Sequence, residues 1–247
     1  YQTAWSWIKN RDATDSHMLF DRVRGIYNDL HSNTNDTEVT NVNTLQRFLN
    51  GGVQVGNDVQ VNTVNESYVA WNWYMEATGS GSALTSGSIN TTALVDTNLG
   101  VSVGTYSGSG SAGTIETGLT NTQFIIVKRR DSGANWASWH VGLTDDRNVY
   151  LDVNNAQQAD GLYDTSSNTS TLIAFGGGGG AVNAGSGTYS FIAFAPSQFT
   201  SIGSYKGNGN ANGSFVPTIN SLGVPIQPAW VMIKRIDAAN NWCMRDI

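Results

Sequence analysis

The chain has 247 residues and a net charge of −6, and only 13% of its residues are charged, against about 25% in a typical soluble protein. Its 8 Trp, 9 Tyr and 8 Phe exclude a disordered chain, and its low Lys content excludes a coiled coil. Nucleic acid is excluded as a main partner because there is no basic run, and a spanning helix because no stretch of about 18 apolar residues occurs.

The first element in chain order is one copy of a repeated segment. Residues 7–12, 126–131 and 232–237 each run from apolar residues into Lys-x-x-Asp, and their lysines lie 119 and then 106 residues apart. Eight residues after the lysine, the second and third copies have Trp136 and Trp242, where the first has His17. Repetition at a fixed offset indicates tandem modules.

Two more matches set the limits of the modules. Residues 68–73 match 189–194 after 121 residues, and residues 104–112 match 203–211 after 99 residues. We therefore expect a first module at 1–77 that lacks its opening strands, a linker at 78–100, a complete module at 101–196, and the opening half of a third module at 197–247.

The elements within the modules are short. Residues 43–49 have the apolar spacing of a two-turn helix. Strands are expected at 123–128, 136–141, 149–151, 170–175 and 188–194, separated by Gly, Asn, Asp and Ser clusters typical of turns. The pattern predicts an all-β fold of tandem antiparallel β-sandwich, jelly-roll-like modules.

The recurrent polar feature is the Lys/Asp pair, which occurs as Lys9/Asp12, Lys128/Asp131 and Lys234/Asp237. We expect the lysine to end a strand and the aspartate to accept backbone amides in the following turn. A polar site in every module is the alternative.

Neither catalytic nor metal-binding nor cofactor-binding residues are predicted. His17, His31 and His140 do not recur and have no partner at metal-ligand spacing. Sequence does not set the separation that paired carboxylates among Asp145, Asp146, Asp152, Asp160 and Asp164 would need for glycoside hydrolysis. Trp136, Trp139 and Trp242 are candidates for stacking on sugar rings, with a place in the core as the alternative.

The runs at 7–12, 68–73, 203–209 and 228–235 resemble a tandem module of the large structural proteins of marine tailed phages, described as a domain of unknown function or as a LamG-like, concanavalin-type jelly roll. The resemblance covers nearly the whole chain and brings no site residues with it. It implies a virion appendage: a tail fibre, a head fibre or a surface decoration.

We therefore expect a non-enzymatic structural and adhesive protein on the virion surface. Its expected partners are copies of itself, as a trimer or a polymer, other virion proteins and a host surface glycan, without membrane insertion. The alternatives are a tail-spike polysaccharide depolymerase and a bacterial extracellular adhesin or filament subunit. The incomplete modules allow strand exchange between neighbouring subunits, or the chain is a fragment of a longer array.

Overall fold

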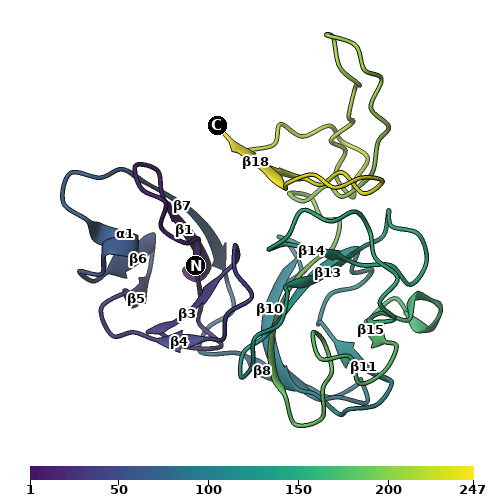
Figure 1. Cartoon of the computed structure of the whole chain (residues 1–247), viewed down its shortest axis with the longest axis horizontal. Helices are drawn as coiled ribbons and strands as arrows, with labels where there is room; N and C mark the ends of the chain where they lie inside the picture. Colours follow the sequence, from purple (N-terminus) through teal and green to yellow (C-terminus); the bar gives the residue numbers. More distant parts are fainter.

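The computed structural model describes residues 1–247 and is built almost entirely of antiparallel strands, which confirms the all-β prediction. Three lobes are arranged around a common centre, and they correspond to the N-terminal, middle and C-terminal parts of the chain (Figure 1). We call them module 1 (residues 1–77), module 2 (78–196) and module 3 (197–247).

Module 1 contains a five-stranded sheet in the order β4-β3-β2-β1-β7. Its strands are β1 (Gln2–Asn10), β2 (Met18–Asp21), β3 (Asn28–His31), β4 (Val39–Thr40) and β7 (Tyr68–Met75). The central strand β1 pairs with β2 on one side and with β7 on the other. A hairpin of β5 (Leu45–Leu49) and β6 (Gly52–Val55) and a one-turn helix α1 (Val59–Asn62) complete the module.

Module 2 contains a seven-stranded sheet in the order β14-β13-β12-β16-β10-β9-β8. Its strands are β8 (Ser82–Leu84), β9 (Thr91–Asp96), β10 (Val101–Ser107), β12 (Phe124–Arg129), β13 (Ala137–His140), β14 (Val149–Tyr150) and β16 (Thr188–Phe194). A separate pair, β11 (Gly113–Glu116) and β15 (Leu172–Phe175), covers one face, and a short 3-10 turn, η1, spans Thr165–Ser167. Strand β12 lies between β13 and β16 as β1 lies between β2 and β7, so the two modules share one topology.

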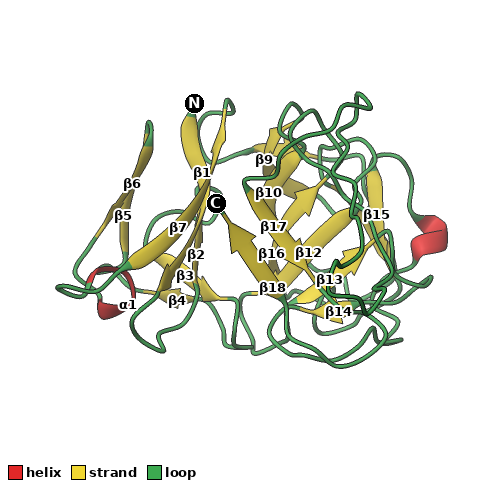
Figure 2. Ribbon diagram, turned by 90° about the horizontal axis from the view of Figure 1, so that it is seen from above, coloured by secondary structure: helices red, strands yellow, loops and turns green.

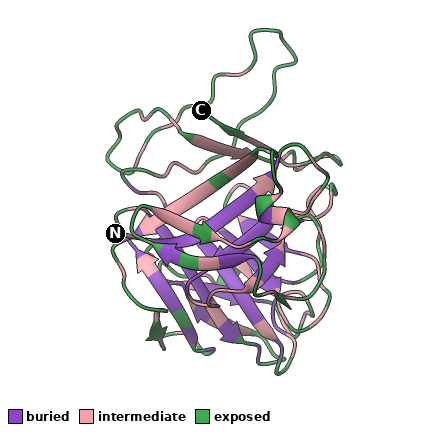
Figure 3. Cartoon of the chain, turned by 90° about the vertical axis from the view of Figure 1, so that its left-hand side faces the viewer, coloured by how far each residue is buried: buried purple, intermediate pink, exposed green.

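Module 3 contributes only one hairpin, β17 (Trp230–Ile233) and β18 (Cys243–Asp246). Residues 203–211, expected to form an opening strand like β10, form no strand and are exposed (Figure 3). Strand β10 is held between β9 and β16, whereas residues 203–211 have neither neighbour, and this accounts for the difference.

The sheets are stacked in layers (Figure 2). One core lies between the sheet of module 2 and β11/β15, and another lies between the sheet of module 1 and β5/β6. A third core lies where the sheets of modules 1 and 2 face each other, with Trp5 and Trp7 against Ile126, Ile192 and Phe194. The contact between modules 1 and 2 is therefore a hydrophobic core of its own, distinct from the cores inside the two modules.

The predicted helix at 43–49 is wrong, because Leu45–Leu49 form strand β5. Leu45 and Phe48 are both buried at a spacing of three residues, which is normally helical. A β-bulge between Leu45 and Arg47 shifts the register by one residue and turns both side chains to the same face.

The predicted linker at 78–100 is also wrong. It contains β8 and β9, which form one edge of the sheet of module 2. The polar sequence of β8 suits an edge strand, and backbone pairing of β8 with β9 and of β9 with β10 holds both strands in the sheet. No helix in the structure is long and apolar enough to cross a membrane.

Candidate functional site: the repeated interface between modules

The repeated lysine marks a turn that contacts the preceding module. We call residues 9–17, 128–136 and 234–242 the receiving turns, and residues 31–38 and 150–157 the docking loops. The two docking loops lie 119 residues apart, as Lys9 and Lys128 do, so they are equivalent parts of modules 1 and 2.

In the two receiving turns that contact a docking loop, which we call engaged, the lysine donates hydrogen bonds to three carbonyl groups. Lys128 Nζ lies 2.9 Å from both Arg129 O and Ala134 O of its own turn and 3.2 Å from Asn35 O of the docking loop. Lys234 repeats this pattern in module 3, and its acceptors are Arg235 at 2.8 Å, Asn240 at 2.8 Å and Asn154 at 3.4 Å. The lysine therefore closes its own turn and ties it to the loop of the module before.

Two backbone hydrogen bonds join each loop to its turn. Ala134 N–H donates to Asn35 O at 2.9 Å, and Glu38 N–H donates to Arg130 O at 2.9 Å. The same two bonds join modules 2 and 3, from Asn240 to Asn154 at 2.7 Å and from Gln157 to Ile236 at 2.9 Å. Because equivalent residues form these bonds at both contacts, the interface between modules 1 and 2 is repeated between modules 2 and 3.

The tryptophan of each engaged turn completes the interface. Trp136 Nε1–H donates to His31 O at 2.9 Å and to Thr34 O at 3.1 Å. Trp242 Nε1–H donates to Tyr150 O at 2.8 Å, and Tyr150 is the equivalent of His31. A buried indole N–H needs such an acceptor, so the tryptophan contributes both apolar area and a directed bond.

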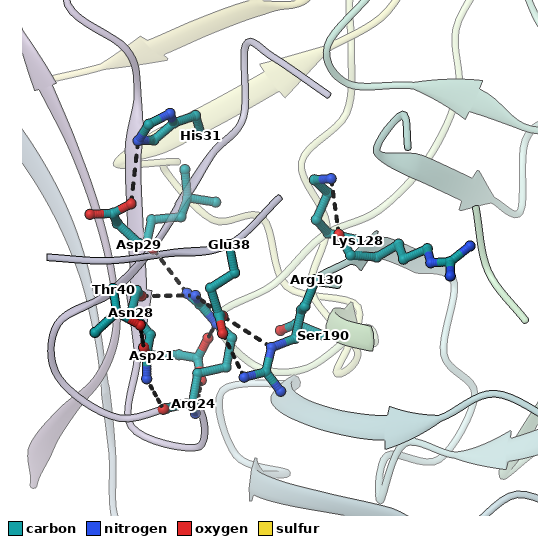
Figure 4. A network of polar contacts seen from close by, with 12 residues as sticks. Asp21, Arg24, Asn28, Asp29, His31, Glu38, Thr40, Lys128, Arg130 and Ser190 are labelled. Atoms are coloured by element: carbon teal, nitrogen blue, oxygen red, sulfur yellow. Dashed lines mark hydrogen bonds and ion pairs between the residues drawn. The ribbon is translucent and has the colours of Figure 1, made fainter. Parts of the chain in front are cut away.

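A network of ion pairs reinforces the first interface (Figure 4). Arg24 is buried and pairs with Asp21 at 2.5 Å and with Glu38 at 2.9 Å. Glu38 also receives two hydrogen bonds from Arg130 of module 2, at 2.7 and 3.0 Å. At the second interface the equivalents of Glu38 and Arg130 are Gln157 and Ile236, which form no ion pair.

Burial and charge shift the ionisation of this network. Burial lowers the pKa of Lys128 to about 8, while the charges of Asp152 and Asp36 act in the opposite direction. Burial tends to raise the pKa of Glu38, but the hydrogen bond from Arg130 and the charge of Arg24 hold it below its usual value. Glu38 is therefore ionised at neutral pH.

The aspartates of the Lys/Asp pairs bond within their own modules. Asp12 Oδ2 accepts the Ser67 N–H at 2.5 Å, and Asp131 Oδ1 accepts the Thr188 N–H at 3.1 Å. Asp237 pairs with Arg235 at 2.7 Å. In modules 1 and 2 the aspartate thus joins its turn to the closing strand, β7 or β16.

Two of the three tryptophans proposed as sugar-stacking residues lie in the interior. Trp136 is 2% exposed in the core between modules 1 and 2, and Trp139 is 7% exposed in the core under β11/β15. Trp242 is half-buried and lies 6.3 Å from the Phe124 ring. The proposed sugar contact is wrong for Trp136 and Trp139, because both side chains are buried.

The histidines and acids do not converge on one site. His17 Nδ1 accepts the Trp7 Nε1–H at 2.9 Å, and His140 Nδ1 accepts the Gly142 N–H at 2.8 Å. Asp152 accepts the Trp136 N–H, and Asp160 accepts the Tyr150 hydroxyl at 2.6 Å. No group of three or more His, Cys, Asp or Glu side chains is placed to hold a metal ion.

The docking loops were missed from the sequence, although a signal was present. Residues 33–38 and 152–157 share Asn or Asp first, Asn third and Glu or Gln last, at the offset of the lysines. Asn33 and Asp152 have the same role, because each accepts the N–H of the residue that ends the receiving turn of its own module, His17 or Trp136.

A groove of about 370 Å³ lies where the three modules meet. Its walls combine aromatic rings with carboxylate and amide groups: Tyr1, Tyr74, Phe199, Leu99, Asp96, Asn98 and Gln198. Phe199 is 62% exposed, so one ring is open to solvent at the rim.

No curated protein and no solved structure shows significant similarity to the chain. One family model, described as a domain of unknown function (DUF7483), matches residues 1–247 and so covers all three modules and both of their interfaces. The chain belongs to the DUF7483 family.

Proposed function

We propose that the protein is a non-enzymatic structural and adhesive component of a phage virion appendage, such as a tail fibre, a head fibre or a surface decoration. The observation that carries the proposal is the repeated interface, in which two docking loops engage two receiving turns through equivalent atoms. Tandem-repeat proteins build rigid objects by stacking small units through one repeated contact. The assignment to a virion rests on the resemblance of the repeat motifs to phage structural proteins.

The lysine, histidine and aspartate side chains that could serve in catalysis form structural hydrogen bonds instead, which also supports a structural role. Lys128 is fully buried against carbonyl groups, His17 accepts from an indole, and Asp152 accepts from a backbone amide. Each of these groups joins strands or modules. An enzyme needs such groups directed at a shared space where substrate can enter.

The adhesive part of the proposal is assigned to the groove between the modules. Aromatic faces that pack on the apolar face of a sugar, beside carboxylate and amide groups that bond its hydroxyls, suit a glycan. Tyr74 and Phe199 would supply the rings, and Asp96, Asn98 and Gln198 the polar contacts. This groove replaces the buried tryptophans as the candidate surface for a host polysaccharide.

A glycan array followed by a product assay tests this function. We expect the chain to bind one class of surface polysaccharide. Phe199→Ala should weaken that binding about tenfold or more, if a sugar ring stacks on Phe199 as strongly as a nucleic-acid base stacks on an aromatic side chain, which is worth about 1–3 kcal/mol. Phe215→Ala is the matched control, because Phe215 is exposed and lies outside the groove. Release of reducing ends from the bound polysaccharide would support the depolymerase instead.

Location and assembly need a separate measurement. Antibodies against the chain should label an appendage of phage particles whose genome encodes it, and native mass spectrometry should show a trimer or a polymer. Unlabelled particles would contradict the virion assignment. A strictly monomeric protein in those particles would contradict the homo-oligomer.

A further inference from the structure

The contact between modules 3 and 1 repeats the contact between modules 1 and 2. Trp5 of module 1 lies 6.1 Å from Phe194 of module 2. Trp230 of module 3, which like Trp5 stands four residues before its lysine, lies 5.5 Å from Trp73 of module 1, the equivalent of Phe194. Module 3 therefore faces module 1 as module 1 faces module 2.

A second pair of positions agrees. Asp21 of module 1 and Ile192 of module 2 line one small cavity between these modules. Their equivalents are Asp246 of module 3 and Trp71 of module 1, and Trp71 Nε1–H donates to Asp246 Oδ2 at 3.0 Å. The three modules thus follow one another around the centre in the order 1, 2, 3 and back to 1 (Figure 1).

The contact between modules 3 and 1 lacks one part of the repeated interface, a docking loop on the receiving turn of module 1. Both docking loops of the chain are engaged, at the receiving turns of modules 2 and 3. The third receiving turn, residues 9–17 of module 1, has no loop against it. In the repeated order of the modules, it is the turn that a docking loop of module 3 would contact.

The receiving turn of module 1 has hydrogen-bonding groups without partners at the positions where the engaged turns bind a docking loop. Lys9 Nζ donates to Asn10 O at 2.6 Å and Ala13 O at 3.0 Å, and it lacks the third acceptor that Lys128 and Lys234 have. Asp15 N–H, the equivalent of Ala134 N–H, has no partner, and Arg11 O, the equivalent of Arg130 O, accepts nothing.

His17 supplies the remaining donor. It stands where the engaged turns have Trp136 and Trp242. Because its Nδ1 accepts the Trp7 Nε1–H, the neutral ring carries its own hydrogen on Nε2. This N–H has no partner in the chain and can replace the indole N–H as donor to a loop carbonyl.

We propose that the receiving turn of module 1 is a docking surface for a third loop of the type found at residues 31–38 and 150–157, which closes the three modules into a ring. The loop would offer one carbonyl to His17, a second to Lys9 and Asp15, and one backbone N–H to Arg11. A repeated heterologous contact with three-fold rotation closes on itself and buries every interface. The inference rests on the repeated contacts and holds whether or not the protein works on a virion.

A chain extended after Ile247 tests the surface. Ile247 is equivalent to Val141, so a copy of residues 142–160 attached there supplies a third docking loop at high local concentration. Amide hydrogen exchange followed by NMR should show Asp15 N–H exchanging at least about tenfold more slowly than in the parent chain. Ala134 and Asn240 amides, already bonded to docking loops, report that both chains are folded.

Two variants separate docking from a general effect of added residues. An extension with the same residues in shuffled order should leave Asp15 unprotected. Lys9→Met should remove most of the protection in the extended chain and change nothing at Ala134 or Asn240. Equal exchange of Asp15 with the ordered and shuffled extensions would overturn the proposal, and protection that occurs only in polymers would overturn ring closure.

Discussion

At the scale of single residues, the repeated lysine joins modules wherever its turn contacts a docking loop, as Lys128 and Lys234 do. Lys128 is fully buried, and its three carbonyl partners come from two modules. A buried ammonium group is tolerated only when its donors are satisfied. The lysine therefore recurs because three carbonyl groups meet at this point and an ammonium group can donate a hydrogen bond to each of them.

Lys128→Met is expected to lower the free energy of unfolding by about 2–4 kcal/mol, because the three carbonyl groups around this fully buried side chain lose a charged donor. Lys234→Met is the matched control. Lys234 makes the same bonds in a more exposed turn, so its loss should cost less than about 1 kcal/mol. Urea unfolding of both variants measures the difference, and equal losses would contradict the role assigned to burial.

His17 should make stability depend on pH. Burial, assisted by the charge of Lys9, lowers its pKa to about 4. The unfolded chain takes up a proton near pH 6.5 that the folded chain does not, so stability falls as pH drops from about 6.5 to 4. Because the ring is partly exposed, we expect a loss of about 2 kcal/mol rather than the full value.

The measurement is urea unfolding at several pH values between 4 and 7, compared with His17→Phe. The variant keeps an aromatic ring but cannot titrate, so its stability curve should be flatter over this interval. A His17→Phe curve parallel to that of the parent chain would assign the pH dependence to other groups.

At the scale of elements, module 2 shows what makes the opening strand form. Strand β10 is central because Val101–Ser107 pairs with β9 on one side and β16 on the other. Gly104 allows the Phe191 ring to lie directly over the strand, since a Cβ here would come within 2.5 Å of that ring. The glycine is thus a packing requirement of this strand.

Gly104→Ala is expected to destabilise the protein by about 2 kcal/mol through overpacking against Phe191. Gly203→Ala is the matched control, because Gly203 is the equivalent residue of module 3 and has no atom near its Cβ position. It should change stability by less than about 0.5 kcal/mol. Thermal melts followed by circular dichroism compare the two, and a large effect of Gly203→Ala would mean that residues 203–211 are packed in solution.

At the scale of the whole molecule, modules 1 and 2 are one cooperative unit. Their sheets share a core that includes Trp5, Trp7, Ile126 and Phe194, so neither sheet can open without exposing the other. Module 3 adds one hairpin and a long exposed segment to the edge of that core.

Unfolding should therefore show one transition for modules 1 and 2 and an earlier one for module 3. Hydrogen exchange followed by mass spectrometry should give one common opening free energy for the core strands β1, β7, β12 and β16. Residues 203–229 should exchange fastest. Separate openings of β1 and β12 would contradict a shared core.

Much of the architecture could be predicted from the pattern of residues. The strand at 188–194 is found with the same limits, and the strand expected at 123–128 is found at Phe124–Arg129. The failures have local causes. Leu45 and Phe48 have helical spacing because a bulge shifts the register of their strand. Residues 82–84 look like a linker because an edge strand can be polar.

The sequence by itself determined the all-β class, the repeat and its lysine, because alternation of apolar residues and fixed offsets are local and visible along the chain. Only the tertiary structure decided what the repeat does. The docking-loop carbonyl groups that accept hydrogen bonds from Lys128 and Trp136 lie about one hundred residues earlier in the chain, and any residue type can supply a backbone carbonyl. The ring order of the modules is likewise decided by which sheet faces bury their aromatic residues together.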